Sequence, residues 1–394
     1  MRDLPPAGAT PRPDIRVPAQ IDTRGAAGPD LGRRVRSLLL SDYFVLYLSL
    51  AYFLVLVPFL PTLSTPGNIS NVLSNMWPLL VVAVGQTFVL TIAGIDLSQG
   101  AVMGLTSVVA AMLIATAAPA SVLANAPVWG TLLTEEGGLL AASPFASALG
   151  IAAMLAVAAL IGLFNGLAVA RLSMPPFMVT LVTMIAVAAF AIWLTQSNNI
   201  RELPDGFVAL GKGDIVSVYL GPKLESQLPR REVHSFVTWP MLIALATAFL
   251  AHLLLNRTVF GRQVFAIGIN RRAAEISGVP VARVIVTVFV ISAVCAAIAS
   301  ILYTARLETG RPTLGAGNFL LDVIGATVIG GTSLFGGKGK VIWTFFGVLF
   351  WVLLSNTLNL MNLSVFHIDM VKGGVILAAA FLDVVRTRLL RSTA

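Results

Sequence analysis

The chain has 394 residues, of which 57% are hydrophobic and only 11% are charged. Because an ordinary soluble domain has about 25% charged residues, this composition excludes a soluble globular fold. The mean hydropathy of +0.88 and a succession of apolar runs about 20 residues long, the length that crosses a bilayer, predict an all-α polytopic membrane protein. The net charge of +8 is less informative than the positions of the basic residues.

The first 36 residues are rich in Pro, Arg, Asp and Gly and contain no continuous apolar segment. They are predicted to form a disordered cytoplasmic tail rather than a signal peptide. Residues 37–394 are predicted to form the transmembrane domain, with about ten transmembrane helices. The expected ranges, in chain order, are 43–61, 72–93, 98–117, 147–170, 177–195, 236–255, 284–305, 319–335, 341–360 and 370–386.

The distribution of basic residues favours an orientation with both termini in the cytoplasm, because cytoplasmic segments of membrane proteins carry an excess of Lys and Arg. The segment 118–146, then outside, contains Glu135 and Glu136 and no Lys or Arg, and the outside loop 196–235 has five basic and five acidic residues. The inside segments would contain Arg33, Arg34, Arg36, Arg171, Arg257, Arg262, Arg271, Arg272, Arg283, Lys338, Lys340, Arg386, Arg388 and Arg391.

A polar interruption in an apolar stretch is the first sign of a transport function. The run that ends near residue 93 is followed by Gly94-Ile95-Asp96-Leu97-Ser98, and a second apolar run begins at once. An ionisable group at membrane depth is costly and usually faces a bundle interior or an aqueous path. Transporters also unwind helices at such glycine-flanked positions, so we expect a broken helix near Gly94–Ser98.

A similar glycine-rich stretch, Gly330–Gly337, follows a later apolar run and predicts a second break. Its likeness to Gly94–Gly100 has two explanations: an internal duplication, which would point to a transporter site, or chance similarity between glycine-rich helix ends. The stretch is not a phosphate-binding loop, because Thr332 replaces the first glycine of that motif and Gly339 replaces its Ser or Thr.

The predicted cytoplasmic loop 256–283 contains a short helix. Asn270 is a favourable N-terminal cap and Gly278 a favourable stop, with apolar or small residues between them. A helix of this length cannot span a bilayer. Two uses remain open at this point: docking on a partner's surface, where Arg271 and Arg272 would meet acidic groups, and packing at the membrane interface.

The chain resembles the membrane subunits of bacterial ABC sugar importers, the ribose/xylose-type permease family related to branched-chain amino-acid permeases. The resemblance covers roughly residues 40–388. The motifs that carry it are Gly94–Ser98 with Gly100, Phe164-Asn165-Gly166, Pro175–Thr180, Gly261-Arg262, Ile267–Asn270, Ala273–Gly278, Gly330–Leu334 with Gly336-Gly337, and Asn356–Asn359. The chain departs from the usual pattern at Ala93, where the family commonly has glycine, and at Gln99, where it has a small or apolar residue.

The resemblance implies a multi-pass protein of the bacterial inner membrane that imports a monosaccharide or polyol and is not itself an enzyme. It implies a periplasmic sugar-binding protein, separate ATPase subunits that hold ATP and Mg²⁺, and a second permease copy or paralogue as partners, with lipid around them and no nucleic acid. No cofactor would be bound by this chain. Residues 270–278 would form the coupling helix that docks into the ATPase, through Asn270, Arg271, Arg272, Ala274, Glu275 and Gly278.

A sugar path should offer amides and hydroxyls in a mostly apolar wall. The residues of this kind within the spans are Gln86, Asp96, Asn165, Thr180, Asn356 and Asn359. Each has an alternative role as a hydrogen-bonding contact between helices, and Asp96 has the further alternative of ordering the backbone at the break. Asp322 is expected to pair with Arg306 or Arg311, and Lys372 to extend to the lipid headgroups.

Other functions are less well supported by the sequence. His234, His252 and His367 are isolated, so no metal site is expected, and Cys295 is expected to be a small packing residue. An ABC permease for a branched amino acid or a nucleoside stays open as an alternative, as does a transporter driven by an ion gradient. The latter is disfavoured by the lack of intramembrane acid–base chains, and a purely structural scaffold has no need of broken helices.

Overall fold

The computed structural model of the protein describes residues 41, 43–219 and 233–391. The predicted cytoplasmic tail, residues 1–36, lies outside the described residues. The chain separates into two units at residues 44 and 45, and the architecture below is that of the second unit.

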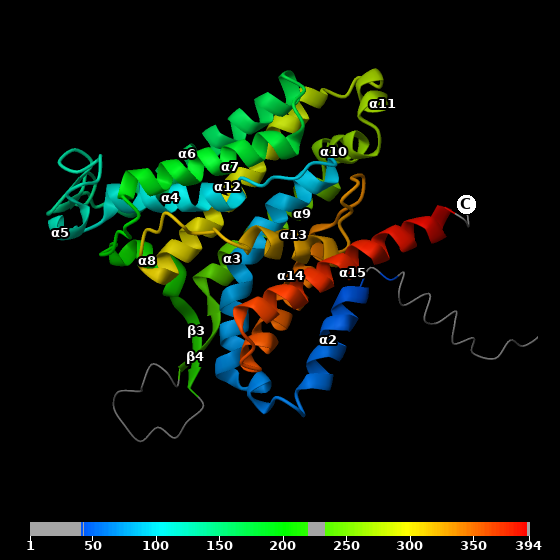
Figure 1. Ribbon diagram of the computed structural model, residues 1–394, viewed down its shortest axis with the longest axis horizontal. Helices are drawn as coiled ribbons and strands as arrows, with labels where there is room; N and C mark the ends of the chain where they lie inside the picture. The colour runs from blue at the N-terminus through cyan, green and yellow to red at the C-terminus, as the bar shows by residue number, and fades with distance from the viewer. Residues whose placement is uncertain (1–40, 42, 220–232, 392–394) are drawn as a thin grey trace, which may run out of the picture. The chain divides into compact units, whose positions relative to one another are not determined.

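A helix is present at each of the ten predicted spans (Figure 1). These are α2 (Phe44–Leu56), α3 (Pro66–Thr91), α4 (Gln99–Ile114), α6 (Ala146–Arg171), α7 (Pro176–Thr195), α9 (Trp239–Arg257), α12 (Val281–Leu307), α13 (Phe319–Gly330), α14 (Val341–Leu360) and α15 (Val365–Arg391). Within the described residues, six of them are long and apolar enough to cross a membrane: α3, α6, α7, α9, α12 and α14. The fold is therefore that of a polytopic helical membrane protein.

The prediction of an all-α fold is wrong in detail, because two antiparallel hairpins are present. One joins β1 (Leu133–Thr134) to β2 (Gly137–Gly138), and the other joins β3 (Asp214–Tyr219) to β4 (Val233–Thr238). The second hairpin lies in the predicted outside loop 196–235, where β-branched and aromatic residues favour strands. Shorter helical elements complete the chain: η1 (Pro61–Ser64), α5 (Ala120–Leu123), α8 (Asp205–Lys212), α10 (Val259–Ile269) and α11 (Arg271–Ile276).

Several helix boundaries differ from prediction, and two of these differences have local reasons. The helix expected from residue 72 begins at Pro66, because the Thr65 hydroxyl caps it by accepting a hydrogen bond from the Asn68 N–H, and proline is favoured in a first helical turn. The helix expected to reach residue 335 ends at Gly330, because Gly331 takes the left-handed conformation with φ of 111°. Glycine adopts that conformation without steric cost and so ends helices.

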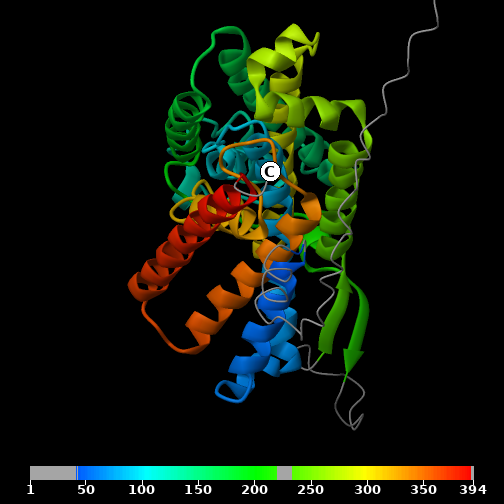
Figure 2. The ribbon, with the colours of Figure 1, turned by 90° about the vertical axis from the view of Figure 1, so that its right-hand side faces the viewer.

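Helix α12 is the centre of the packing and contacts α3, α4, α6 and α8 (Figure 1 and Figure 2). Small residues allow the close approach. A Cβ on Gly162 of α6 would lie 2.7 Å from the Phe289 carbonyl oxygen of α12, and one on Gly85 of α3 would lie 2.9 Å from the Cβ of Cys295. Membrane helices commonly associate through such residues. Cys295 is buried in this contact, which confirms its predicted packing role.

Candidate functional site

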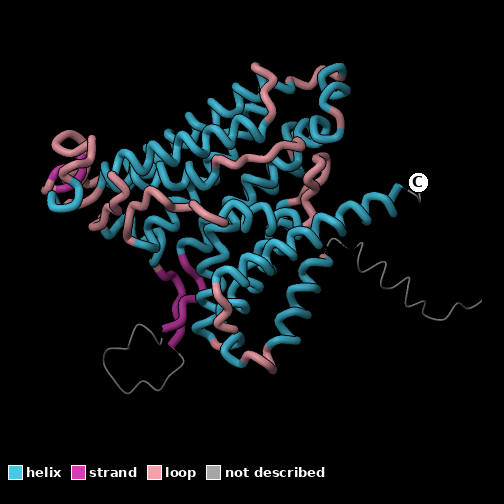
Figure 3. Tube along the Cα trace, viewed as in Figure 1, coloured by secondary structure: helices cyan, strands magenta, loops and turns pink. Residues whose placement is uncertain are grey.

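The predicted break near Gly94–Ser98 is confirmed: α3 ends at Thr91, α4 begins at Gln99, and the residues between them are not helical (Figure 3). Ala93 takes a left-handed conformation with φ of 59°, and the Gly94 N–H then donates to the Val89 carbonyl at 2.9 Å. The position where the resembling family commonly has glycine is therefore one at which an alanine is conformationally strained.

The carboxylate of Asp96 holds this segment together. One oxygen, Oδ1, accepts hydrogen bonds from the backbone N–H of Ser98 at 2.9 Å and from its hydroxyl at 2.6 Å. The other, Oδ2, accepts from the Ser292 hydroxyl of α12 at 2.6 Å. Asp96 is 1% exposed, and three donors satisfy a buried carboxylate in a way that apolar neighbours cannot. The alternative that Asp96 orders the backbone at the break is confirmed by these contacts.

Two hydrogen-bond chains converge on that carboxylate. From α7, the Thr183 hydroxyl donates to Asn165 Oδ1 of α6 at 2.6 Å, and Asn165 Nδ2 donates to the Ser98 hydroxyl at 3.0 Å. From the other side, Gln99 Nε2 donates to the Ser292 hydroxyl at 2.9 Å. Every donor in both chains points toward the carboxylate, so four helices and the break share one buried polar network. Within such a network each bond supports the next.

Two further residues were predicted to line a substrate path. Thr180 contacts the break beside the network, and Gln86 lies in the buried part of α3. The Thr180 hydroxyl donates to the Pro176 carbonyl at 2.9 Å and to the Ile95 carbonyl of the break at 3.2 Å. Gln86 of α3 is fully buried, and both polar atoms of its amide lack a hydrogen-bond partner among the described residues. Gln86 thus retains a free amide, whereas Asp96, Asn165 and Thr180 are already bonded within the protein.

Asn356 and Asn359 of α14 are not brought to the break. Asn356 forms a reciprocal pair of 2.9 Å hydrogen bonds with Asn68, in the first turn of α3, whereas Asp96 lies beyond the last turn of that helix. A helix of 26 residues is about 39 Å long. Asn359 Nδ2 donates to the Ser355 carbonyl of its own helix at 2.7 Å. The six residues therefore occupy two separate places.

The two glycine-rich interruptions contact each other. The Gly337 N–H, in the loop between α13 and α14, donates to the Thr91 carbonyl at the end of α3 at 2.9 Å. Gly268 of α10 completes the junction, since a Cβ there would lie 1.8 Å from the Thr91 oxygen and 2.5 Å from the Gly337 nitrogen. Ala93 also contacts Gly336, where an added Cβ would lie 2.8 Å from the Ala93 Cβ. We call the contact of Thr91, Gly268 and Gly337 the glycine junction.

The short helix predicted after Asn270 is present as α11, which begins three residues after Gly268 of the glycine junction. Asn270 Oδ1 accepts from the Ala273 N–H at 3.0 Å, and Gly278 follows the helix with φ of 81°. Arg271 and Glu275 form an exposed ion pair at 3.4 Å. Ala274 is buried against the protein's own core, and the exposed apolar side chain of α11 is Ile276, at 82%. The sequence analysis did not predict α10, the helix that precedes α11. Its sequence signal was Thr258, whose hydroxyl caps α10 by accepting from the Gly261 N–H.

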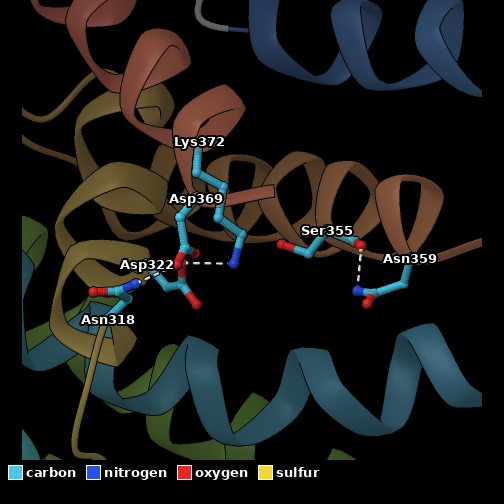
Figure 4. A network of polar contacts seen from close by, with 6 residues as sticks. All are labelled: Asn318, Asp322, Ser355, Asn359, Asp369 and Lys372. Atoms are coloured by element: carbon cyan, nitrogen blue, oxygen red, sulfur yellow. Dashed lines mark hydrogen bonds and ion pairs between the residues drawn. The ribbon is translucent and has the colours of Figure 1, made fainter. Parts of the chain in front are cut away.

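The acidic residue of α13 pairs differently from prediction (Figure 4). Asp322 Oδ1 accepts from Lys372 Nζ of α15 at 2.9 Å, rather than from Arg306 or Arg311. Lys372 therefore contacts a neighbouring helix and is partly buried instead of extending to the headgroups. Beside this pair, Asn318 Nδ2 donates to Asp369 at 2.6 Å. These two contacts fix the start of α13 against α15.

A non-helical segment, residues 308–318, crosses α4 at the end of α12 that is remote from α11. Small residues of α4 permit the contact. A Cβ on Gly100 would lie 2.2 Å from the Gly315 oxygen, and a Cβ on Gly104 would lie 2.4 Å from the Pro312 oxygen. One turn further, the Ser107 hydroxyl accepts from the Arg311 N–H at 3.0 Å. At membrane depth, irregular backbone is tolerated where it is buried in protein or lines a cavity.

Two cavities share Arg306 in their walls, and the first of them adjoins this segment. The first, of about 390 Å³, we call the aromatic cavity; its lining includes Asn75, Met103, Tyr303, Arg306, Gly315 and Phe319. The second, of about 280 Å³, lies between α3, α8, α12 and the β3–β4 hairpin, and its lining includes Ser70, Lys212, Asp214 and Thr238. The Tyr303 and Phe319 rings meet edge to face, with centroids 6.1 Å apart. Sequence reasoning named Arg306 only as a partner for Asp322 and did not identify either cavity.

Arg306 is held in place by the broken hydrogen-bond ladder of α3. Pro78 lies inside that helix and has no N–H, so the Ser74 carbonyl four residues earlier lacks its intrahelical donor. Arg306 Nη1 donates to this carbonyl at 3.0 Å and to Asn75 Oδ1 at 2.9 Å. A proline within an apolar helix was the sequence signal that a polar side chain from elsewhere is needed here.

Among the described residues, no group of three or more His, Cys, Asp or Glu side chains has the arrangement of a metal site. His252 lies within hydrogen-bond distance of Asn256, and His367 of Ser364. The side chain of His234 lies outside the described residues.

Long apolar helices, interrupted at two places that pack against each other, define a multi-pass membrane protein of the transporter class. Residues 68–380 match the family described as branched-chain amino acid transport system / permease component, and the chain belongs to this family.

The ribose import permease of Haemophilus influenzae is 32% identical over 82% of this chain and 87% of its own length. The ribose import permease of Bacillus subtilis is 33% identical over 86% and 91%. The xylose transport system permease of Haemophilus influenzae is 30% identical over 80% and 88%. No solved structure matches the chain. The protein is a multi-pass component of the bacterial inner membrane and a transport subunit.

Proposed function

We propose that this chain is the permease subunit of an ATP-driven importer for a monosaccharide or a related polyol. The observation that carries the proposal is the similarity, over most of both chains, to permeases named for the import of ribose and xylose. We further propose ten membrane-spanning helices with both termini in the cytoplasm, which the excess of basic residues in the corresponding loops supports.

In this proposal α11 is the helix that docks into a separate ATPase subunit, which supplies ATP and Mg²⁺. Its surface supports such a role. Ile276 is 82% exposed, and two other exposed apolar residues flank the same region: Ile269, at 75%, and Phe335, at 72%. Arg271 and Glu275 carry the charges that a partner would meet. A large exposed apolar side chain rimmed by charge is typical of an interaction site.

The glycine junction supports a mechanical link between the docking helix and the break. Helix α11 follows Gly268 of α10 by three residues, and Gly268 touches the Thr91 end of α3 through its backbone. A movement of α11 against an ATPase would therefore act on the segment that holds Asp96. The substrate-path roles of Gln86, Asp96, Asn165, Thr180, Asn356 and Asn359 belong to this proposal, as does a second permease copy or paralogue.

The test is ATP hydrolysis by the permease reconstituted with its ATPase and a periplasmic binding protein. The panel contains D-ribose, D-xylose, L-arabinose, D-allose, leucine and uridine. We expect one of the sugars to stimulate hydrolysis. Stimulation by leucine or uridine alone would replace the sugar with an amino acid or a nucleoside. Uptake by the permease alone, abolished by an ionophore, would favour a gradient-driven transporter and overturn the proposal.

The interface has a matched pair of variants. Ile276→Ser removes the exposed side chain of α11, and Ile215→Ser makes the same change at an exposed isoleucine of the β3–β4 hairpin. We expect only Ile276→Ser to uncouple hydrolysis from sugar. The exchange Arg271→Glu with Glu275→Arg keeps an ion pair within α11 but reverses the charges that face a partner, and should uncouple as well. Equal effects of the two serine variants would remove α11 from the interface.

A further inference from the structure

The aromatic cavity has the chemistry of a monosaccharide site, and it lies at the end of α12 opposite the proposed docking helix. Val281, the first residue of α12, follows α11 by five residues, and Tyr303 and Arg306 are in its last turns. The 27 residues of this helix extend about 40 Å. If α11 meets an ATPase in the cytoplasm, the cavity is on the side from which a substrate arrives.

The lining combines apolar faces with fixed polar groups. Tyr303 and Phe319 supply aromatic surface, and a sugar ring presents an apolar C–H face that such rings can cover. Asn75 and Arg306 supply an amide and a guanidinium for sugar hydroxyls. The cavity volume of about 390 Å³ lies within the range of about 300–1,000 Å³ that is usual for small-molecule sites.

The polar groups are oriented before any ligand arrives. Asn75 Nδ2 donates to the Asn71 carbonyl at 2.9 Å, which leaves Asn75 Oδ1 to accept from Arg306. Both described hydrogen bonds of Arg306 come from Nη1, while a guanidinium carries five N–H groups. Its remaining donors have no acceptor among the described residues. A side chain anchored by one nitrogen, with the others unused, is suited to bind hydroxyl oxygens without reorganisation.

The backbone of residues 314–316 forms part of the wall. This segment is irregular where it crosses α4, and transporters expose backbone groups to a substrate at such interruptions. We propose that the aromatic cavity is an entry site for a monosaccharide on the permease, in which Phe319 and Tyr303 cover the sugar ring and Asn75 and Arg306 hold its hydroxyls. The inference rests on the proposed function and deepens it by naming the site.

The chain allows a direct test because it contains one cysteine, Cys295, which is buried. In a Cys295→Ala background, Ala316→Cys places a single thiol in the cavity wall. Ala142→Cys makes the same change in an exposed loop residue outside the cavity. The assembled transporter, with ATPase and binding protein, is labelled by a membrane-impermeant methanethiosulfonate with and without D-ribose, D-xylose, L-arabinose or D-allose.

We expect the transported sugar to slow labelling of Ala316→Cys and to leave Ala142→Cys unchanged. At a concentration about ten times the dissociation constant the free fraction of the site, and with it the labelling rate, falls about tenfold. Leu307→Cys, in another part of the wall, repeats the measurement should Ala316→Cys assemble poorly. An unchanged labelling rate in a transporter that still takes up the sugar would overturn the site, whereas no uptake of any sugar by the unaltered transporter would instead contradict the proposed function.

A docked binding protein could also cover residue 316, so a second variant separates the two explanations. Phe319→Leu keeps an apolar side chain but removes the ring, and loses contact equivalent to about one or two CH₂ groups. Protection should then need a sugar concentration about four- to fifteenfold higher. Phe190→Leu removes a ring that stacks on Trp193 outside the cavity and should leave protection unchanged. Protection that is indifferent to Phe319→Leu would assign it to the docked protein and overturn the proposal.

Discussion

Arg306 of α12 donates a hydrogen bond to the backbone carbonyl of Ser74 in α3, the acceptor that Pro78 leaves without an intrahelical partner. The contact joins two long helices at the point where one of them has lost a hydrogen bond. Because Ser74 is partly buried, leaving its carbonyl without a hydrogen-bond donor would be costly. The same guanidinium lines both cavities, so the repair of a helix defect fixes the position of a cationic group in a cavity wall.

The first prediction concerns this repair. Arg306→Met leaves the Ser74 carbonyl unpaired and should lower the free energy of unfolding by about 1–3 kcal/mol. Pro78→Ala restores an N–H at position 78, which can donate to the Ser74 carbonyl. In the Pro78→Ala background, Arg306→Met should therefore lower the free energy of unfolding by about 0.5–1.5 kcal/mol less than in the unaltered chain. Denaturation in detergent of the four members of this double-mutant cycle measures the difference. An identical cost in both backgrounds would show that Arg306 does not act through this carbonyl.

The second prediction concerns the carboxylate at the break. Asp96→Ala leaves the Ser98 N–H and the hydroxyls of Ser98 and Ser292 without their acceptor, and should lower the free energy of unfolding by about 3–5 kcal/mol. Asp96→Asn keeps one side-chain oxygen as the acceptor for Ser98 and turns its NH₂ group toward Ser292. Only the Ser292 hydroxyl then loses its acceptor, which should lower the free energy of unfolding by about 1–2 kcal/mol. Denaturation in detergent compares the two variants. If Asp96→Asn were as damaging as Asp96→Ala, the negative charge itself, rather than the hydrogen bonds, would hold the break.

Sequence reasoning reached the helices because each is an apolar run of sufficient length, and reached both breaks because glycine and polar residues interrupt those runs. It also placed the caps of α11, since Asn270 and Gly278 act through their immediate neighbours. These features depend on local chemistry. The start of α3 at Pro66 was missed although it is also local, because hydropathy was weighted above the Thr65 cap.

The site was harder to predict because its contacts join distant parts of the chain. Asp96 and Ser292 are 196 residues apart, and Asn68 and Asn356 are 288 apart. Hydropathy selects polar residues within spans but does not say which of them meet, so residues at the two ends of α3 were grouped as one path. The partner of Asp322 was missed for the same reason, since it depends on how α15 lies against α13.

The third prediction concerns the glycine junction. Gly268→Ala would place a methyl group 1.8 Å from the Thr91 oxygen, so α10 must move away and the Thr91–Gly337 hydrogen bond is lost. Overpacking of this severity should cost about 3 kcal/mol or more. Gly67→Ala is the matched control, because nothing lies within 4 Å of the added Cβ in the first turn of α3. It should be neutral or stabilise by up to about 1 kcal/mol.

Denaturation in detergent gives both values, and the sugar-stimulated ATPase assay adds a functional reading. Because α11 begins only three residues after Gly268, Gly268→Ala should also reduce stimulation in whatever fraction of the transporter stays folded. Full stability and full stimulation in that variant would contradict the close packing of the three elements.

The fourth prediction concerns the ion pair between α13 and α15. The side chains of Lys372 and Asp322 are 15% and 23% exposed, and Lys372 Nζ also lies 5.7 Å from the centre of the Trp351 ring. Lys372→Met leaves the Asp322 carboxylate partly buried and unpaired, and should lower the free energy of unfolding by about 1–3 kcal/mol. Adding Asp322→Leu removes that uncompensated charge, so the double variant should recover most of the loss.

A matched control is the pair Lys212–Glu308, whose side chains are 44% and 50% exposed. Lys212→Met should cost no more than about 1 kcal/mol, because solvent screens an exposed pair and hydrates the carboxylate that is left. Denaturation in detergent compares the three variants. If Lys372→Met cost as little as Lys212→Met, the pair would be solvated as fully as the exposed one and would not fix α15 against α13. If Asp322→Leu failed to restore stability, the loss would come from the contact of Lys372 with Trp351, and the charge of Asp322 would not be its cause.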